Sequence, residues 1–285
     1  MPFIKMHGAG NDYVYIDTFD GKSIDDPHTL ARQMSHRRFG VGGDGLILIH
    51  PSEVADARMQ MHNADGSESE MCGNGIRCVA KYLYDEGLVH KPELRIETGA
   101  GVLTLRLEPD ASDRVKQVTV NMGRPRLSAA EIPTTVLSND DRVIDVPVEF
   151  DGKTYAVTCV SMGNPHCVLF VPEASDALVL GLGPRIETDP RFPKRTNVEF
   201  VEVISRGEVR QRTWERGSGE TWACGTGASA VCVAGVLTGR TEDRILNHLV
   251  GGDLRLHYDG EVVWMTGGAV TTFRGSWSMP NATAT

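Results

Sequence analysis

Two cysteines in this sequence are followed by the same glycine pattern. Residues 72–75 read Cys-Gly-Asn-Gly and residues 224–227 read Cys-Gly-Thr-Gly, and each stretch opens a segment with helical spacing. A thiol at a helix start lies near unpaired N–H groups and the positive end of the helix dipole, which favours the thiolate and lowers the pKa. The N–H groups after each cysteine can also hold an anion. We therefore predict two reactive thiols, each beside an anion-binding turn.

Two such thiols suit one of two kinds of chemistry. The first is reversible disulfide formation, and the second is proton exchange at a carbon acid, with a thiolate base on one face and a thiol acid on the other. The second arrangement inverts a stereocentre. It is favoured by polar residues suited to binding ammonium and carboxylate groups, which a redox pair would not need: Asn11, Asn63, Asn164, Asn197, Glu215 and Arg216.

Strand patterns dominate the rest of the chain. Helices are predicted at residues 27–36 and after each Cys-Gly-x-Gly stretch, where apolar residues recur at positions 76, 79, 80, 83 and 84 and at 228, 231, 232, 235 and 236. Gly87 and Gly239 should end these two helices. Alternating or β-branched runs predict strands at 13–17, 45–50, 94–97, 102–107, 115–121, 155–160, 167–171, 198–204, 209–215, 254–258 and 262–266.

The sequence also contains traces of an internal duplication. Cys72 and Cys224 are 152 residues apart, and the glycine-rich loops that begin nine residues before each, at Asn63 and Glu215, have the same offset. Asn11 and Asn164 match at an offset of 153. Glycine is common in this chain, so chance is the alternative, but three matches at nearly one offset favour two homologous halves. Each half should be a strand-rich sheet wrapped around its long helix.

Composition excludes several other classes of protein. The 285 residues are 40% apolar and carry a net charge of −9, which fits a globular chain and argues against nucleic-acid binding. The longest uncharged run, 221–239, contains too many Gly, Thr and Ser residues to span a membrane, and the first residues lack an apolar signal core. We therefore expect a cytoplasmic protein whose six cysteines are free. Phosphate loops, dinucleotide fingerprints and metal-ligand spacings are absent, and Lys5 is the only lysine in the motifs described below that could form a Schiff base, so no cofactor and no metal are expected.

Five ordered motifs give the chain a specific resemblance. They are KMHGAGND at 5–12, NADGS at 63–67, MCGNGIRC at 71–78, SMGNPHC at 161–167 and ERGSGETWACGTG at 215–227. Together they resemble the diaminopimelate epimerase family, and the likeness runs from residue 5 to residue 267. The family interconverts LL- and meso-2,6-diaminopimelate in lysine and peptidoglycan precursor biosynthesis, without a cofactor.

The resemblance implies an α/β (α+β) fold of two pseudo-symmetric domains. Each would be a strand-rich, barrel-like sheet around a central helix, with the site in the cleft between them. We place the first half at 1–123, joined by the C-terminal segment 272–285, and the second at 124–271. The family likeness also implies a homodimer, and a small-molecule substrate, diaminopimelate, as the only other partner.

The resemblance further implies a role for each matched residue. Cys72 and Cys224 would be the acid/base pair, with His166 and Glu215 tuning the thiol pKa. Substrate would be held by Asn11, Asn63, Gly73, Asn74, Asn164, Asn197, Glu215, Arg216, Gly225 and Thr226. One position departs from the pattern, because some family members carry Gln where this chain has Gly45. A side-chain contact to substrate is then missing there, so Gly45 is left out of the predicted site.

Two other functions remain open at this stage. A proline racemase-like enzyme also has a cysteine pair, although Asn197, Glu215 and Arg216 better fit an acyclic diamino diacid with a distal end to anchor. A thiol redox switch or a binding module without turnover is the other, and it would not exchange the substrate α-hydrogen. The remaining cysteines are predicted to pack inside the protein: Cys78, Cys159, Cys167 and Cys232. Residues 281–285 are predicted to be a frayed tail.

Overall fold

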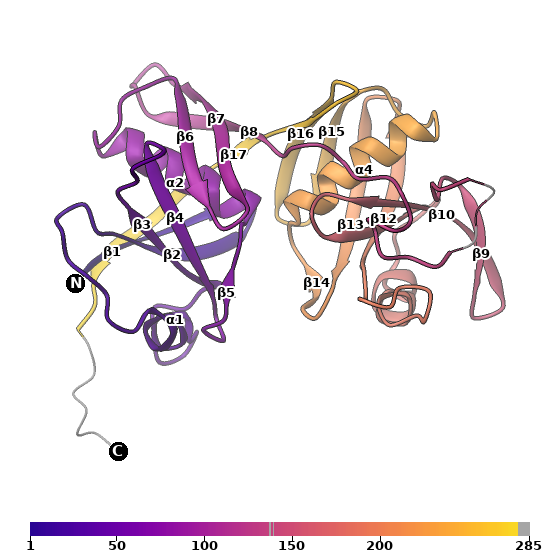
Figure 1. Cartoon of the computed structure of the whole chain (residues 1–285), viewed down its shortest axis with the longest axis horizontal. Coiled ribbons are helices and arrows are strands. Elements are labelled where there is room, and N and C mark those ends of the chain that lie inside the picture. Colours follow the sequence, from indigo (N-terminus) through magenta and orange to yellow (C-terminus); the bar gives the residue numbers. More distant parts are fainter. Residues whose placement is uncertain (137, 139, 279–285) are drawn as a thin grey trace. The chain divides into compact units, whose positions relative to one another are not determined.

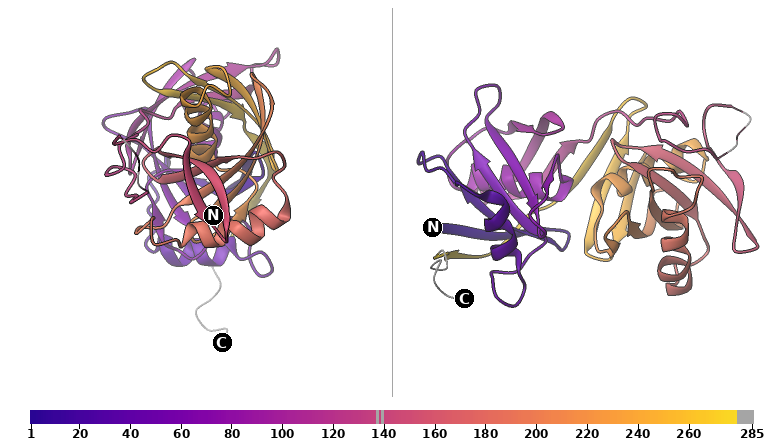
Figure 2. Two further views of the ribbon diagram at one scale, coloured as in Figure 1. Left: turned by 90° about the vertical axis from the view of Figure 1, so that its right-hand side faces the viewer. Right: turned by 60° about the horizontal axis from the view of Figure 1, so that its bottom comes forward.

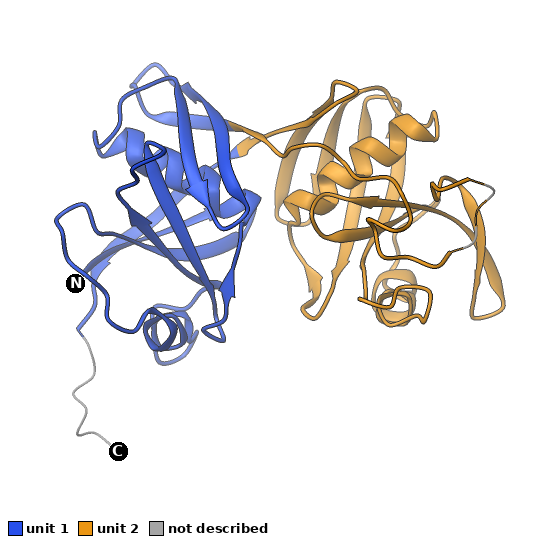
Figure 3. Ribbon diagram, in the orientation of Figure 1, with its two compact units in different colours: residues 1–118, 268–285 blue, residues 119–267 orange. Residues whose placement is uncertain are grey.

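The computed structural model describes residues 1–136, 138 and 140–278, so the predicted tail at 281–285 lies outside the described residues. The chain divides into two compact units, residues 1–118 with 268–285 and residues 119–267 (Figure 3). The chain leaves unit 1 within strand β8 and returns within strand β17.

Unit 1 is built mainly of strands, with two helices. Its elements are β1 (Pro2–Gly8), β2 (Asn11–Asp17), α1 (Pro27–Ser35), β3 (Gly45–His50), β4 (Ala57–Asn63), β5 (Glu68–Ser69), α2 (Gly73–Asp85), β6 (Glu93–Thr98), β7 (Gly101–Pro109), β8 (Val115–Asn121) and β18 (Val270–Ser276) (Figure 1).

Unit 2 contains the remaining elements. They are β9 (Val146–Phe150), β10 (Lys153–Ser161), β11 (Pro165–Phe170), a π-helical turn η1 (Ala177–Leu182), α3 (Gly183–Glu187), β12 (Asn197–Ser205), β13 (Glu208–Glu215), β14 (Gly219–Thr221), α4 (Gly225–Leu237), β15 (Arg244–Leu249), β16 (Gly252–Tyr258) and β17 (Val263–Gly268). None of the helices described in the structure is long and apolar enough to cross a membrane.

The two units repeat one order of strand pairing. In unit 1, β2 is antiparallel to β1 and parallel to β3, β4 is antiparallel to β3 and β5 and parallel to β6, and β6 is antiparallel to β7. In unit 2, β11, β10, β12, β13, β14, β15 and β16 pair in the same senses and the same order. The repeat extends to the helices, because α2 follows β5 as α4 follows β14. This order is what a duplicated chain would produce.

The long helix of each unit is enclosed by strands. Helix α2 contacts β1, β2, β6 and β7, and α4 contacts β10, β11, β12, β15 and β16, which surround it in the left view of Figure 2. Ten of the thirteen residues in each helix are buried. Small residues permit this enclosure of α4: a Cβ atom on Gly235 would lie 2.2 Å from the hydroxyl oxygen of Thr241. The predicted fold class is therefore confirmed.

The predicted helices and strands are confirmed where their signals are local. Helix α1 begins with Pro27 after the N-cap Asp26, whose side chain accepts a hydrogen bond from the Thr29 N–H. Gly87 and Gly239 follow α2 and α4 with φ of 70° and 68°, the left-handed conformation that ends helices. The sequence patterns missed the strands β1, β4, β5, β9, β14, β15 and β18, and also η1 and α3. Strand β1 lies between β2 and β18, and its pairing with β18 joins residues far apart in the chain.

Candidate active site

Both predicted thiols cap their helices. Cys72 and Cys224 are the N-cap residues of α2 and α4, and each sulfur accepts a hydrogen bond from the third helical N–H, Gly75 or Gly227, at 3.4 Å. In α4 the N–H groups of Gly225 and Thr226 precede the first intrahelical hydrogen bond, as the first residues of any helix do. Each unit therefore places a sulfur atom at the positive end of a buried helix dipole.

In unit 1, polar side chains of two elements meet at Cys72. Its thiol donates to Oδ1 of Asn11 at 3.2 Å, and the amide of Asn74 donates to the same oxygen at 3.4 Å. Asn11 is held in turn, because its amide nitrogen donates to Asp44 at 2.7 Å. Asn63 ends β4, where its amide nitrogen donates to Ser67 at 3.0 Å. Of the predicted residues in unit 1, Asn11 contacts the thiol group directly, and Asn74 donates to the same Asn11 oxygen.

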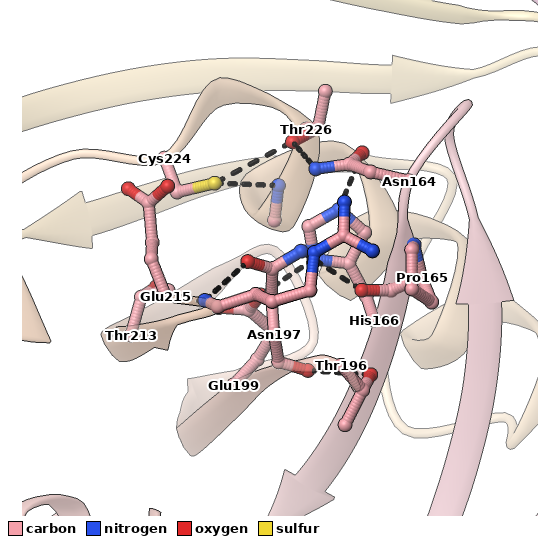
Figure 4. Close-up of polar contacts among 12 residues, drawn as sticks. Asn164, Pro165, His166, Thr196, Asn197, Glu199, Thr213, Glu215, Cys224 and Thr226 are labelled. Atoms are coloured by element: carbon pink, nitrogen blue, oxygen red, sulfur yellow. Dashed lines mark hydrogen bonds and ion pairs between the residues drawn. The ribbon is translucent and has the colours of Figure 1, made fainter. Parts of the chain in front are cut away.

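In unit 2, hydrogen bonds join Cys224 to a histidine through two polar side chains (Figure 4). The sulfur lies 3.4 Å from the hydroxyl of Thr226, which accepts from the amide nitrogen of Asn164 at 3.2 Å. The amide oxygen of Asn164 lies 3.0 Å from Nε2 of His166. On the other side of the ring, Nδ1 lies 2.7 Å from the carboxylate of Glu199, and both side chains are fully buried.

The other predicted residues of unit 2 are Asn197, Glu215 and Arg216, which form hydrogen bonds with one another and with neighbouring residues. The amide of Asn197 donates to the Pro165 carbonyl at 2.8 Å, and its oxygen accepts from the Arg216 N–H at 2.9 Å. Glu215 accepts from the Thr221 hydroxyl at 2.5 Å. The guanidinium of Arg216 is exposed and donates to the Lys194 carbonyl at 3.1 Å. Asn197 therefore positions the turn that presents Glu215 and Arg216.

The pKa of Cys224 differs from the sequence prediction. Burial raises the pKa of its thiol well above the ordinary value, and the charges of Glu215 and Glu199 raise it further, while the hydrogen bonds from Thr226 and Gly227 lower it. The prediction of a lowered pKa is therefore wrong for Cys224, because the helix terminus is buried beside two carboxylates. Burial also raises the pKa of the Glu215 carboxyl, and the neighbouring charge of Glu199 adds to that shift.

Gly45 lies where a side chain has no room. A Cβ atom there would lie 2.1 Å from the His62 carbonyl oxygen and 2.8 Å from the ring of Tyr13. The strand registers match Gly45 with Asn197, because Gly45 pairs with Tyr13 and Asn197 pairs with His166. Tyr13 thus takes the place in unit 1 that His166 takes in unit 2, so the two halves surround their thiols differently.

Sequence reasoning missed three residues that support the candidate site. They are Asp44, which holds Asn11; Glu199, which holds His166; and Arg77, a fully buried arginine in α2. Arg77 donates to the Gly73 carbonyl at 3.1 Å and to the side-chain oxygen of Asn74 at 3.0 Å. The available signal was a charge inside an otherwise apolar stretch: Arg77 follows Ile76 in α2, and Glu199 stands between Val198 and Phe200 in β12.

The four cysteines predicted to be core residues are buried and free: Cys78, Cys159, Cys167 and Cys232. Across the described part of the chain, no group of three or more His, Cys, Asp or Glu side chains is arranged to hold a metal ion.

The fold is shared with several solved structures of low sequence identity. A probable proline racemase from Agrobacterium radiobacter K84 superposes with a TM-score of 0.71 and 17% identity, over 99% of this chain and 94% of that one. A phenazine biosynthesis protein of the PhzF family from Bacillus anthracis superposes with a TM-score of 0.67 and 15% identity, over 96% and 98% of the two chains. Likeness at this identity concerns the fold alone.

Comparisons of the amino-acid sequence identify the family more specifically than the comparisons of structure do. The family model described as diaminopimelate epimerase matches residues 3–128 and 158–272. The diaminopimelate epimerase of Brachyspira hyodysenteriae is 52% identical over 277 residues, which are 97% of this chain and 98% of that protein. That of Moorella thermoacetica is 50% identical over 281 residues, or 98% and 100% of the two chains. Two of the motifs form the repeated helix caps, and the sequence similarity extends along nearly the whole length of the chain. The chain therefore belongs to the diaminopimelate epimerase family.

Proposed function

We propose that this chain interconverts LL- and meso-2,6-diaminopimelate, and so supplies L-lysine and peptidoglycan precursor synthesis. The observation that carries the proposal is the pair of matched helix caps, Cys72 on α2 and Cys224 on α4, in a member of this family. An epimerisation that uses one base and one acid needs two such groups. The repeat supplies them from equivalent positions.

The proposed reaction moves two protons and needs no cofactor. One cysteine, as the thiolate, removes the α-hydrogen and becomes a thiol. The other cysteine, as the thiol, gives its proton to the opposite face of the same carbon and becomes a thiolate. The configuration inverts, the number of protons on protein and substrate is unchanged, and the thiolate has moved from one sulfur to the other. Both sulfurs must therefore reach one α-carbon during turnover.

The α-hydrogen beside an ionised carboxylate is very weakly acidic, so negative charge must be stabilised as the proton leaves. We propose that the first N–H groups of the two helices, at Gly73 and Asn74 and at Gly225 and Thr226, bind the reacting carboxylate. The burial of α4 supports this role, because a hydrogen bond is electrostatically stronger where water is excluded. The raised pKa of the Cys224 thiol indicates that it rests protonated, ready to act as the acid.

The remaining predicted residues are proposed to bind the ends of the substrate. Arg216 offers a planar fork for a carboxylate, and Glu215 offers a partner for an ammonium group. The amides of Asn11, Asn63, Asn164 and Asn197 would complete the set, with Asn197 acting through the turn that it holds. His166 and Glu215 are proposed to tune the thiols. This recognition of a distal amino acid end would exclude proline.

We also propose domain boundaries, a cellular location and an oligomeric state. We infer an N-terminal half at 1–123 with 272–285 and a C-terminal half at 124–271, and the two compact units support this division, with boundaries four or five residues away.

We infer a cytoplasmic homodimer that binds neither nucleic acid nor membranes. Light scattering of the purified protein should give twice the mass of one chain. A monomeric mass at micromolar concentration would contradict the dimer.

One experiment tests the reaction and its mechanism together. Purified, reduced protein is incubated with LL-diaminopimelate in heavy water, and the reaction is stopped early. The product should carry deuterium at the inverted centre, while recovered substrate should carry almost none. A single shared base would instead exchange the recovered substrate or carry the original hydrogen into the product.

Single cysteine variants complete the test. Cys72→Ala and Cys224→Ala should each abolish epimerisation, because each direction needs one base and one acid. Cys232→Ala, which changes a buried cysteine on the same helix as Cys224, should remain active. Epimerisation by the Cys72→Ala protein at near the wild-type rate would refute the two-thiol mechanism.

The substrate assignment has its own test. Arg216→Lys keeps the charge but loses the planar fork, so kcat/KM should fall by about tenfold or more. Arg210→Lys, an exposed position paired with Glu202, is the matched control. An unchanged kcat/KM for Arg216→Lys would remove Arg216 from the site. Turnover of proline in place of diaminopimelate would favour a proline racemase instead.

A further inference from the structure

A buried carboxylate at the end of helix α3 contacts two other segments of unit 2. Glu187 is the last residue of α3 and is almost completely buried. One of its oxygens accepts a hydrogen bond from the N–H of Gly217 at 2.9 Å and another from the guanidinium of Arg195 at 3.3 Å. The other oxygen accepts from the indole N–H of Trp214 at 2.8 Å. Glu187 therefore joins the loop at 192–197 to the turn at 214–218.

Helix α3 itself does not favour a carboxylate at this position. The last turn of a helix carries the negative end of the dipole, which repels an anion. The three groups around the Glu187 carboxylate are all donors, and one of them is a cation, so they compensate for its burial. The position of this residue is therefore explained by the segments that it holds rather than by the stability of its own helix.

The contacts of Glu187 lie on both sides of the two residues proposed to bind the distal end of the substrate. Trp214 directly precedes Glu215, and Gly217 directly follows Arg216. Between them, the N–H of Arg216 donates to the side-chain oxygen of Asn197 at 2.9 Å. The turn is thus held at positions 214, 216 and 217 by side chains of α3 and β12.

The second segment that Glu187 holds contacts the Arg216 side chain. Arg195 has a φ of 58°, the left-handed conformation that is strained for a residue other than glycine. Its side chain donates to Glu187, and the carbonyl of the preceding residue, Lys194, accepts from the guanidinium of Arg216 at 3.1 Å. Glu187 therefore acts on Arg216 in two ways, on its backbone through Gly217 and on its guanidinium through the loop that contains Lys194.

The equivalent turn of unit 1 is held by its own side chains. It begins at Asn63, 152 residues before Glu215, and Asp65 in it accepts from the N–H and the hydroxyl of Ser67 at 2.8 and 2.6 Å. The matching positions in unit 2 are Gly217 and Gly219, with φ of 79° and 81°. Glycine allows many backbone conformations, so contacts from outside this turn must select one of them.

We propose that Glu187 is a positioning residue for substrate recognition: it holds the turn at 214–218 and the loop at 192–197 in the arrangement in which Glu215 and Arg216 bind the distal amino acid end. The inference rests on the proposed function for its kinetic consequence, but its structural content, one carboxylate that fixes two N–H groups of the turn, does not. Glu187 acts without touching the substrate. Because the turn is ordered beforehand, binding does not include the entropic cost of ordering it.

Replacing Glu187 with glutamine keeps the shape of the side chain but cannot keep all three hydrogen bonds. The new amide has one oxygen and one NH₂ group, whereas Trp214, Gly217 and Arg195 are all donors. Whichever way the amide is turned, either the indole N–H or the Gly217 N–H faces another donor. Glu187→Ala removes all three hydrogen bonds at once.

The structural test measures hydrogen exchange by NMR on the full-length reduced protein. In the wild type, the Gly217 amide and the Trp214 indole hydrogen should each exchange about tenfold or more below their intrinsic rates, and the indole of the exposed Trp222 should not. A Trp214→Phe sample identifies the indole signal. In Glu187→Gln, at least one of the two hydrogens should lose its protection.

Kinetics with diaminopimelate test the consequence for recognition. Glu187→Ala should raise KM by about tenfold or more and leave kcat within about threefold, because the distal end is bound equally in the ground state and the transition state. Glu187→Gln should raise KM by a smaller factor. Added to Arg216→Lys, Glu187→Ala should lower kcat/KM by less than the product of the two single effects, because both changes act on Arg216.

Glu202→Gln is the matched control. Glu202 also accepts from one backbone N–H, that of Ala174 at 2.9 Å, and from one arginine, Arg210 at 2.6 Å. Its replacement should leave KM and both exchange rates unchanged.

Fast exchange of either hydrogen in the wild type would overturn the proposal without any variant, so a Glu187→Ala protein that fails to fold does not protect it. Full protection of both hydrogens in Glu187→Gln, an unchanged KM for folded Glu187→Ala, or a double variant whose loss equals the product would also overturn it. If the wild type does not epimerise diaminopimelate but both hydrogens are protected as expected, the proposed function fails and the role of Glu187 in holding the turn stands.

Discussion

The carboxylate of Glu199 lies directly against Gly227 in the first turn of α4. A Cβ atom on Gly227 would lie 2.6 Å from Oε1 of Glu199. In unit 1 the matched glycine, Gly75, faces Ile47, and a Cβ atom there would lie 2.6 Å from the terminal methyl group of that side chain. The same helix position is therefore crowded by a carboxylate in α4 and by the end of a flexible apolar side chain in α2.

This pair of glycines yields a matched stability prediction. In Gly75→Ala the new methyl group meets the end of a flexible apolar side chain. The gain in helix propensity of about 0.5–1 kcal/mol should offset the free-energy cost of displacing the Ile47 side chain. Ala at position 227 meets a carboxylate held by three hydrogen bonds, so Gly227→Ala should destabilise by about 1–3 kcal/mol. Thermal unfolding of both variants measures the difference. Equal melting temperatures would show that Glu199 moves as freely as Ile47.

Arg77 is expected to be among the least replaceable residues of unit 1. Its guanidinium is fully buried and donates to Gly73, Asn74 and the Gly268 carbonyl, the last at 3.3 Å. Arg77→Lys keeps the charge but cannot reach three separated oxygens, so it should cost about 2 kcal/mol or more in unfolding free energy. Denaturant unfolding measures this cost.

The control for Arg77→Lys is an exposed arginine. Arg106 pairs with Glu93 on the surface, and Arg106→Lys should change the unfolding free energy by no more than about 0.5 kcal/mol. A similar small change for Arg77→Lys would mean that the ammonium group satisfies the same oxygens.

His62 should make the protein sensitive to acid. The side chain is buried in β4, packs edge-on against His28 with ring centroids 4.9 Å apart, and neither of its ring nitrogens has a hydrogen-bond partner. Burial lowers the pKa of its imidazole below the ordinary 6.5, and the charge of His28 contributes in the same direction while that of Glu68 opposes it. Because the unfolded chain then binds a proton more readily than the folded one, stability is lost as the pH falls below about 6.5.

His62→Phe tests this origin. The phenyl ring keeps the edge-on contact and removes two buried polar atoms, so stability at pH 7.5 should be unchanged or raised by about 1 kcal/mol. Between pH 7 and pH 5 the variant should lose less melting temperature than the wild type. Parallel curves for the two proteins over this range would assign the acid sensitivity to other groups.

The two proposed catalytic thiols should react with alkylating agents at different rates. Cys224 is buried with a raised pKa, whereas Cys72 is partly exposed. In ligand-free protein at pH 7.5, iodoacetamide should label Cys72 well before Cys224, because only the thiolate reacts. Peptide mapping over time measures both rates, and labelling of Cys224 should accelerate as the pH rises toward 10. Equal rates at pH 7.5 would contradict the protonated resting state of Cys224.

The sequence by itself determined the features that depend on local order. Both helix caps follow from cysteine and glycine placed directly before a 3.6-residue apolar repeat, and the chain ends α2 and α4 at glycines that adopt positive φ. The duplication was readable because matched motifs lie at one offset. The family could be named because its motifs are long and stand in order. All of these are properties of neighbouring residues or of fixed spacings.

Only the tertiary structure decided which charges lie behind the thiols. Glu199 stands in an apolar strand, and nothing near it in the sequence indicates that β11 and β13 bring His166, Gln211 and Thr213 to its two oxygens. Strand register decides such contacts, and register joins residues that are far apart in the chain. The raised pKa of the Cys224 thiol has the same origin. A helix start favours the thiolate, but burial and carboxylates brought in by other strands outweigh it, and burial is a property of the whole fold.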